Sequence, residues 1–181
     1  MPQGGGTQAD EVYGNKFLVN SLKFIYAAIR YNVFWTLENP ARSLMFLMPS
    51  VCKLLQAKST GSVLFDQCMY GLHDPESKLL YQKRTRIIGN LPQLQLLCRD
   101  CSHDHVHEQI VGQTHLHGKS IGRSVVAGAY PPLLCTALAK AAQQAATESA
   151  SHRMARLRRQ CPLDLAGPGV HAGPRGRSSY P

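Results

Sequence analysis

The chain has 181 residues and a formal net charge of +9, from 20 lysines and arginines against 11 acidic residues. Its hydrophobic share of 44% and charged share of 17% exclude a chain that is disordered throughout, and they leave room for one domain with a sizeable core. The positive charge favours anionic partners, nucleic acid above all, although a solvated basic face with a basic tail would give the same charge.

The predicted elements alternate between helices and strands. Residues 1–14 begin with a run of glycines, and we expect them to be disordered. In chain order we then expect a helix from Phe17, a strand at 33–37, a helix at 41–57 that bends or restarts at Pro49, strands at 62–66 and 85–88, a short helix at 91–97, and an Ala-rich helix from 131 to about 159. The strand at 33–37 is almost wholly apolar, which is typical of a parallel sheet that is buried on both faces.

This pattern predicts an α/β domain over residues 15–146, with a Cys/His-rich insertion at 98–117. Residues 147–181 hold most of a cluster of arginines and are expected to form a basic helix end and a disordered tail.

The sequence shows neither a secretory signal nor a membrane span. The first residues lack the basic and apolar segments of a signal peptide. The longest apolar stretch, residues 17–35, contains Lys23 and Arg30, which are costly in hydrocarbon. We therefore expect an intracellular protein, nuclear or cytoplasmic and not secreted. Its six cysteines are then thiols or metal ligands rather than a disulfide framework.

Two motifs carry candidate binding chemistry. Glu38 follows the predicted strand at 33–37, where open α/β sheets bind ligands, and its carboxylate is placed to accept a hydrogen bond from an amine. Arg84 and Arg86 share one face of the strand that follows Gln82. Each motif also has a purely structural interpretation. The residues around Glu38 would form the N-terminal turn of a helix, and the stretch that contains Arg84 and Arg86 would be a solvated edge strand. Together they predict that the carboxylate of Glu38 and the two guanidiniums converge at one end of neighbouring strands.

In order, these motifs resemble those of cytosine-5 DNA methyltransferases over about residues 15–145. The shared motifs are Glu38-Asn39-Pro40, then Tyr70-Gly71 followed by Gln82-x-Arg84-x-Arg86, then Tyr130-Pro131 before a helix. The resemblance implies a partial Rossmann-like methyltransferase sheet with flanking helices. It also implies that Glu38 binds a flipped-out cytosine, that Arg84 and Arg86 support that carboxylate, and that Tyr130 and Pro131 close the pocket for S-adenosylmethionine.

The departures from that family are as informative. No cysteine precedes Cys52 to act as the family's nucleophile, and the run Gly4-Gly5-Gly6 follows no strand, so it is not the methyl-donor turn. Because methyl transfer to the ring needs the nucleophile, we expect the chain to be inactive alone. The first hypothesis is a truncated or degenerate methyltransferase-like protein that retains nucleic-acid binding, to DNA rather than RNA. The alternative is half of a split enzyme that a second chain completes.

A third hypothesis is a small zinc-containing nucleic-acid-binding module. Four residues of the Cys/His-rich stretch form our expected ligand set: Cys98, Cys101, His103 and His107. His105 is a substitute ligand. The alternative interpretation is a pair of ordinary thiols beside a polar loop, and Cys68, outside this stretch, is predicted to be a buried thiol.

Overall fold

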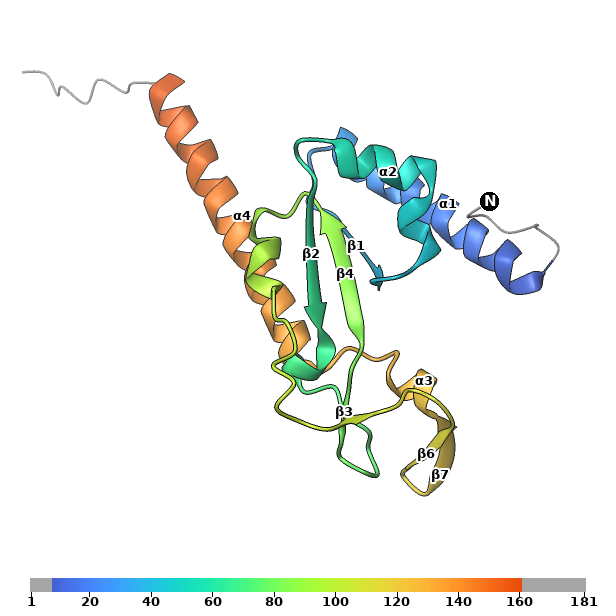
Figure 1. The fold of residues 1–181 in the computed structure, drawn as a ribbon. Helices are drawn as coiled ribbons and strands as arrows, with labels where there is room; N and C mark the ends of the chain where they lie inside the picture. The colour runs from blue at the N-terminus through green and yellow to red at the C-terminus, as the bar shows by residue number, and fades with distance from the viewer. Residues whose placement is uncertain (1–7, 161–181) are drawn as a thin grey trace, which may run out of the picture. The chain divides into compact units, whose positions relative to one another are not determined.

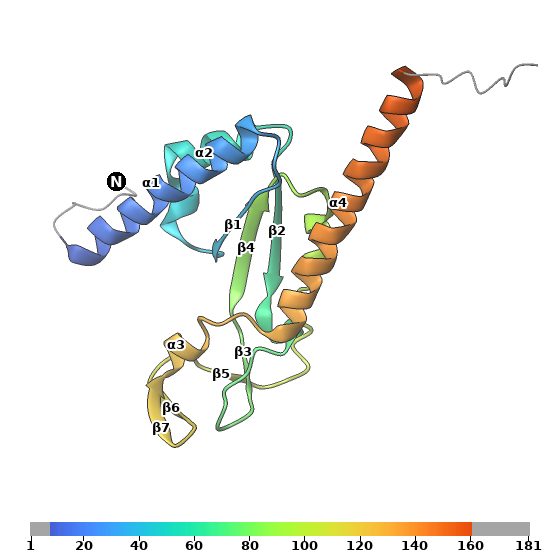
Figure 2. The same ribbon diagram turned by 180° about the vertical axis from the view of Figure 1, so that it is seen from behind.

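The structure is a computed structural model that describes residues 8–160, with side chains described to residue 151. Contacts divide the chain into two units, residues 1–146 and residues 147–181. The first unit is a mixed α/β fold in which helices flank a three-stranded sheet (Figures 1 and 2). The α/β class predicted from the sequence is thereby confirmed.

The central sheet has the strand order β1-β4-β2. Its strands are β1 (Thr36–Pro40), β2 (Gly61–Asp66) and β4 (Arg84–Gly89). Strand β4 runs antiparallel to both neighbours, so the prediction of a parallel arrangement is wrong for this sheet. The strands predicted at 62–66 and 85–88 are confirmed within one residue at each end.

Strand β1 starts three residues later than the sequence predicted. The side chain of Asn90 accepts the N–H of Trp35 at 2.7 Å and donates to the carbonyl of Val33 at 3.2 Å. The side chain of Asn90 thus takes the backbone groups at the start of the apolar run that a neighbouring strand would otherwise bind. As a consequence Glu38 lies within β1 instead of after it.

One face of the sheet is covered by three helical segments: α1 (Ala9–Arg30), the 3-10 turn η1 (Leu44–Leu47) and α2 (Pro49–Gln56). Leu18, Leu22 and Ile25 of α1 pack with Ile88 of β4 in a hydrophobic cluster. Helix α1 already begins at Ala9, so the prediction of disorder is wrong for residues 9–14. The expected restart at Pro49 is confirmed, since a proline fits the first turn of a helix.

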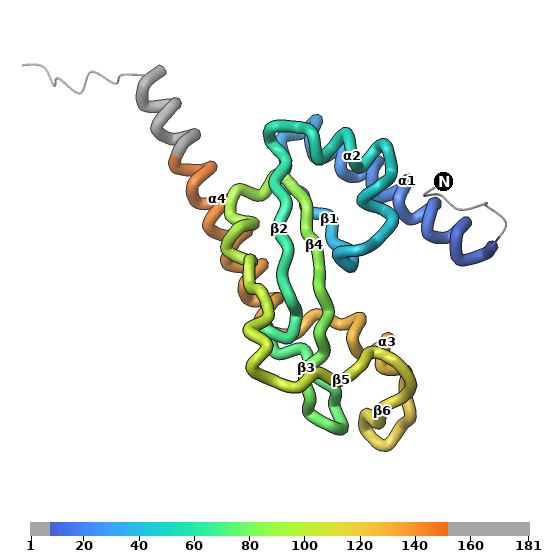
Figure 3. Tube along the Cα trace, viewed as in Figure 1, coloured from blue at the N-terminus to red at the C-terminus, as the bar shows by residue number. Residues whose placement is uncertain are grey.

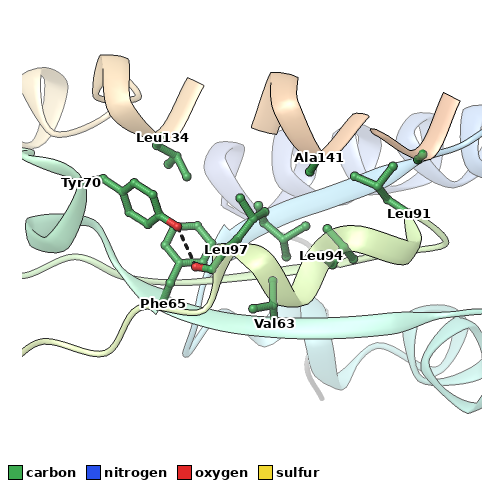
Figure 4. Close-up of a cluster of buried hydrophobic side chains, with 10 residues drawn as sticks. Val63, Phe65, Tyr70, Leu91, Leu94, Leu97, Leu134 and Ala141 are labelled. Carbon is green, nitrogen blue, oxygen red and sulfur yellow. Dashed lines mark hydrogen bonds between the residues drawn. The ribbon is translucent and has the colours of Figure 1, made fainter. Parts of the chain in front are cut away.

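The other face packs on η3 (Pro92–Leu97) and on the start of α4 (Pro132–Gln160). Figure 4 shows Val63 and Phe65 of β2 facing Leu134 and Ala141 of α4, with Leu91, Leu94 and Leu97 between them. The hydroxyl of Tyr70 donates to the carbonyl of Leu97 at 2.8 Å. The Ala-rich helix predicted to about residue 159 is confirmed, whereas the part of the predicted disordered tail beyond residue 160 lies outside the described residues.

Short elements below the sheet make up the rest of the first unit (Figure 3). They are the 3-10 turn η2 (Gln67–Tyr70), strands β3 (Leu80–Tyr81), β5 (His107–Glu108), β6 (Gln113–Leu116) and β7 (Lys119–Gly122), and helix α3 (Arg123–Val126). Strands β3 and β5 pair in parallel, and β6 and β7 form a hairpin. His117 and Gly118 both have positive φ in its two-residue turn, as a hairpin turn of this length requires.

A buried carboxylate, Asp74, ties these short elements together. It accepts hydrogen bonds from the hydroxyls of Tyr81 and Thr114, from Nε of Arg123 at 3.0 Å, and from the N–H groups of Glu76 and Ser77 at 2.9 Å each. Burial by itself raises the pKa of Asp74, but these donors outweigh it and hold that pKa well below its usual value. The segment from 72 to 126 is therefore organised around one ionised group.

Among the residues that the structure describes, none of the helices has both the length and the apolar character that a membrane crossing needs.

Candidate metal centre

The end of strand β2 brings two distant segments together. Cys68 lies in η2, directly after β2, and its side chain is buried. The adjacent Asp66 accepts the N–H of Cys101 at 3.0 Å, and its own N–H donates to the carbonyl of Arg99 at 2.9 Å. These two hydrogen bonds, one of them to the side chain of Asp66, hold the segment after η3 alongside η2, so the two cysteines face the same space.

Four side chains converge there: Cys68, Cys101, His105 and His107. Their ligand atoms all lie within 4.8 Å of one another. The sulfur of Cys101 is 3.7 Å from Nε2 of His105 and 3.5 Å from Nε2 of His107. Zinc bonds of about 2.3 Å to sulfur and about 2.0 Å to nitrogen give a tetrahedron whose edges are roughly 3.6 Å. The group therefore has the donors of a tetrahedral Cys2His2 zinc site, and the distances from the sulfur of Cys101 to the two imidazoles match its spacing.

Neighbouring polar groups orient one of the imidazoles. Nδ1 of His105 lies 2.8 Å from the carboxylate of Asp104, which also accepts the hydroxyl of Ser102 at 2.6 Å. A carboxylate partner at Nδ1 leaves Nε2 as the lone-pair nitrogen that points toward the sulfurs. Both contacts lower the pKa of Asp104, that from Ser102 more than that from His105. The carboxylate beside the imidazole is thus kept ionised.

The electrostatics of the group without a cation also fit a metal site. Burial, and then the neighbouring thiol of Cys101, raises the pKa of Cys68 to about 12. Burial, and then the charges of His105 and His103, lowers the pKa of His107. Without a cation, burial thus favours the neutral forms of Cys68 and His107. A divalent cation would offset the thiolate charges that its binding requires.

Two of the four expected ligands belong to this group, and two do not. Cys101 and His107 belong to the group, and the substitute His105 belongs to it as well. Cys98 does not, because it caps the end of η3 with an exposed side chain. His103 does not either, since it takes a left-handed turn with φ of 57° next to Cys101.

Cys68 is the ligand that sequence reasoning missed. Its predicted burial is confirmed, but its role as a candidate ligand depends on a tertiary contact with a segment far along the chain. The one available signal was its position just after a buried strand, next to the acidic residue Asp66.

The predicted convergence of Glu38 with Arg84 and Arg86 is wrong. In the ladder, Glu38 is opposite Ile87 and Asn39 is opposite Arg86. Because side chains alternate along a strand, Glu38 lies on the face of Ile87, and both arginines lie on the other face.

The two guanidiniums have other partners. Arg86 donates to the hydroxyl of Ser62 at 2.9 Å and stacks 4.9 Å from the ring of Phe46. Arg84 pairs with Asp66 and with Asp100, at 2.8 Å each. The arginines therefore fasten the sheet to its surroundings.

Glu38 instead meets another residue that the sequence had singled out. The hydroxyl of Tyr130 donates to Oε2 of Glu38 at 2.7 Å, across 92 positions of sequence. Burial, and then this contact, raises the pKa of Tyr130. Oε1 of Glu38 is buried and has no hydrogen-bond partner within the described part of the chain. Pro131 is buried beside Tyr130, and its carbonyl accepts the N–H of Leu134 as α4 begins.

Comparisons with protein-family models, with curated proteins and with solved structures find no match to this chain. The resemblance to cytosine-5 DNA methyltransferases thus depends on its motifs alone. The contact between Glu38 and Tyr130 joins two of those motifs, whereas the opposed faces of Glu38 and Arg86 separate two others.

Proposed function

We propose that the chain is a zinc-stabilised module that binds nucleic acid, with the α/β sheet as its scaffold. The observation that carries the proposal is the group formed by Cys68, Cys101, His105 and His107. Two thiols and two imidazoles whose ligand atoms lie within 4.8 Å of one another suit zinc better than magnesium and calcium, which prefer oxygen ligands.

Zinc at this position would fix the segment that leads from η3 to β5. Residues 98–106 contain no helix or strand. A four-coordinate ion would tie this segment to η2 at the end of β2. Metal binding would then contribute directly to folding, as it does in other small sites with a closed ligand shell.

The charge distribution supports nucleic acid as the partner. The chain carries a net charge of +9, and two of its acids, Asp66 and Asp74, are buried against arginines. Exposed lysines lie at positions 16, 23, 53, 58, 119 and 140. Such a surface attracts a phosphate backbone through counterion release.

Metal content tests the first half of the proposal. We expect purified wild-type protein to contain one zinc per chain, and Cys101→Ser and Cys68→Ser to lose it. Cys98→Ser is the matched control, because this exposed cysteine lies outside the group, and it should keep the metal. Cobalt substitution should add thiolate charge-transfer absorption that Cys101→Ser lacks. A metal-free wild type, or equal loss in Cys98→Ser, overturns the zinc site.

Fluorescence anisotropy with labelled oligonucleotides tests the second half. We expect binding that weakens steeply as salt rises, because each phosphate contact releases counterions. Absence of binding at low salt overturns the nucleic-acid role and leaves zinc as a structural element only.

A second candidate function, base recognition by a methyltransferase-like remnant, is favoured by the Glu38 carboxylate. Its buried Oε1 is without a partner in the described residues, and Glu38 also lines a cavity of about 530 Å³ together with Asn39 and residues of α1. One free carboxylate oxygen can accept a hydrogen bond from the exocyclic amine of an extruded cytosine. Methyl transfer itself would need a second chain to supply the nucleophilic cysteine and the S-adenosylmethionine site.

Binding of duplexes that differ in one unpaired cytosine tests this candidate. We expect wild-type protein to prefer the duplex with the unpaired cytosine, and Glu38→Gln to lose that preference while keeping its affinity for matched duplex. Equal binding of both duplexes by wild-type protein removes the candidate.

A further inference from the structure

Helix α1 has two faces with different surroundings. Leu18, Leu22 and Ile25 are buried against the sheet. Another side carries three exposed aromatic side chains, with exposed fractions of 70% for Tyr13, 80% for Phe17 and 77% for Phe24, and Tyr31, which caps the C-terminal end of α1, is exposed by 73%. Steps of four and seven residues keep these rings in one row along the helix. Aromatic side chains left in water at this density mark a binding surface.

A row of cations runs beside the aromatic row. Lys16, Lys23 and Arg30 follow at intervals of seven residues, or about 10 Å along the helix. On the far side of the cations lies a second apolar row, which contains Val12, Val19 and Tyr26. From residue 12 to residue 31 the sequence contains no acidic residue.

The cationic row also borders a shallow hollow on the helix. Val12, Lys16, Val19 and Lys23 line it, together with asparagines. This face of α1 therefore offers aromatic rings and positive charges side by side. The ligand that matches all of them is a flexible polyanion that also has aromatic faces.

We propose that this face of α1, defined by Tyr13, Lys16, Phe17, Lys23, Phe24 and Tyr31, binds single-stranded nucleic acid. The inference rests on the nucleic-acid binding proposed above and assigns it to one surface. Lysines would contact successive phosphates while the rings stack on bases, the combination used in sequence-tolerant binding of single strands. A duplex hides the faces of its bases, so protruding rings favour unpaired strands.

Two other occupants fit the face less well. If a second copy of the chain bound here through the same face, the row of Lys16, Lys23 and Arg30 would approach an identical row of like charge, which would repel it. If the face bound a lipid surface, the cations would enter the apolar layer together with the apolar rows, because the cations lie between those rows rather than on their outer flanks. Nucleic acid turns the same central cations into favourable contacts.

Anisotropy with a labelled single strand of about 20 nucleotides, compared with a duplex of the same sequence, tests the assignment. The double variant Phe17→Ala/Phe24→Ala should weaken single-strand binding at least about fivefold per ring removed. The matched control is Leu96→Ala/Leu133→Ala, because these side chains are exposed by 62% and 59% on other elements. The control should bind like wild type. Circular dichroism and zinc content verify that both variants remain folded.

A charge variant gives a second, independent measurement. Lys23→Glu should weaken binding and reduce its dependence on salt, whereas Lys119→Glu, on exposed strand β7, should weaken binding much less. If wild-type protein binds nucleic acid but the α1 variants bind equally well, this assignment is overturned and the proposed function stands.

The remaining outcomes also decide the question. Loss of binding only when Arg156, Arg158 and Arg159 are replaced by alanine places the ligand elsewhere and overturns the assignment. Dimerisation that the Phe17→Ala/Phe24→Ala variant abolishes, or preferential binding to anionic vesicles, overturns it as well. A wild-type protein that binds no nucleic acid overturns both proposals.

Discussion

Replacing Asp74 by asparagine removes the charge at the centre of the segment from 72 to 126. The carboxylate is fully buried and accepts from two hydroxyls, two backbone N–H groups and the guanidinium of Arg123. Asparagine has nearly the same shape, but its amide N–H2 would face donors. Arg123, only 22% exposed, would lose its main counter-charge.

The expected cost follows from these contacts. Hydrogen bonds to a charged acceptor are each worth about 1.5–3 kcal/mol, and breaking a buried ion pair by removing one partner costs about 3–5 kcal/mol. Because the five contacts share one carboxylate, their contributions do not add. We expect Asp74→Asn to lower the free energy of unfolding by about 3–5 kcal/mol, a large part of the stability of an ordinary domain.

Urea denaturation at pH 7 measures this loss, with the fluorescence of Trp35 as the probe. Trp35 is the single tryptophan and is buried. Glu76→Gln is the control, because Glu76 lies two residues after Asp74 and its contact with His115 is exposed to water, so its loss should cost far less than that of Asp74. Equal losses for the two variants would refute the argument from burial.

The pH dependence of the same difference is a further check. The pKa of Asp74 is lower in the folded protein than in the unfolded chain, so its contribution is complete above about pH 4 and is lost as the pH falls toward the folded pKa. The gap between wild type and Asp74→Asn should therefore be widest near neutral pH and shrink in acid. A gap that widens on acidification would contradict the assigned ionisation.

Two further substitution pairs test the packing of the sheet. A Cβ at Gly89 would lie 2.3 Å from the carbonyl oxygen of Trp35, so Gly89→Ala should destabilise the fold by at least about 1–3 kcal/mol. Gly61→Ala should be far milder in the same denaturation series, since a Cβ at Gly61, the ladder partner of Gly89, meets nothing closer than 3.8 Å. On α4, Leu134→Ala should cost about 2–5 kcal/mol, because Leu134 is fully buried, whereas Leu133→Ala should cost less than about 0.5 kcal/mol. Similar melting temperatures within either pair would show that the described packing is wrong.

The sequence predicted elements well where the signal is local. Strands β2 and β4 were found from short β-branched and apolar runs, and the start of α4 from consecutive prolines before an Ala-rich stretch. It failed at β1, where the same apolar signal continues through Val33 and Trp35. There a side chain on another segment, Asn90, takes the backbone groups that a strand would use.

The candidate metal site was predicted in part for the same reason. Cys101, His105 and His107 lie close in sequence, so their spacing already suggests a shared ion. Cys68 joins them only because Asp66 fastens the segment after η3 to the end of β2. Spacing also favoured Cys98, and only its orientation at the end of η3 removes it.

By itself, the sequence determined the α/β class, the positive charge and the cluster of metal-binding residue types, since each depends on composition or on periods of a few residues. The tertiary structure decided which strands pair and in which direction, and thereby placed Glu38 with Tyr130 on the face opposite to Arg86. It also decided which cysteine completes the metal group and which side of α1 stays exposed. Those outcomes depend on contacts between distant segments, whose geometry no local pattern encodes.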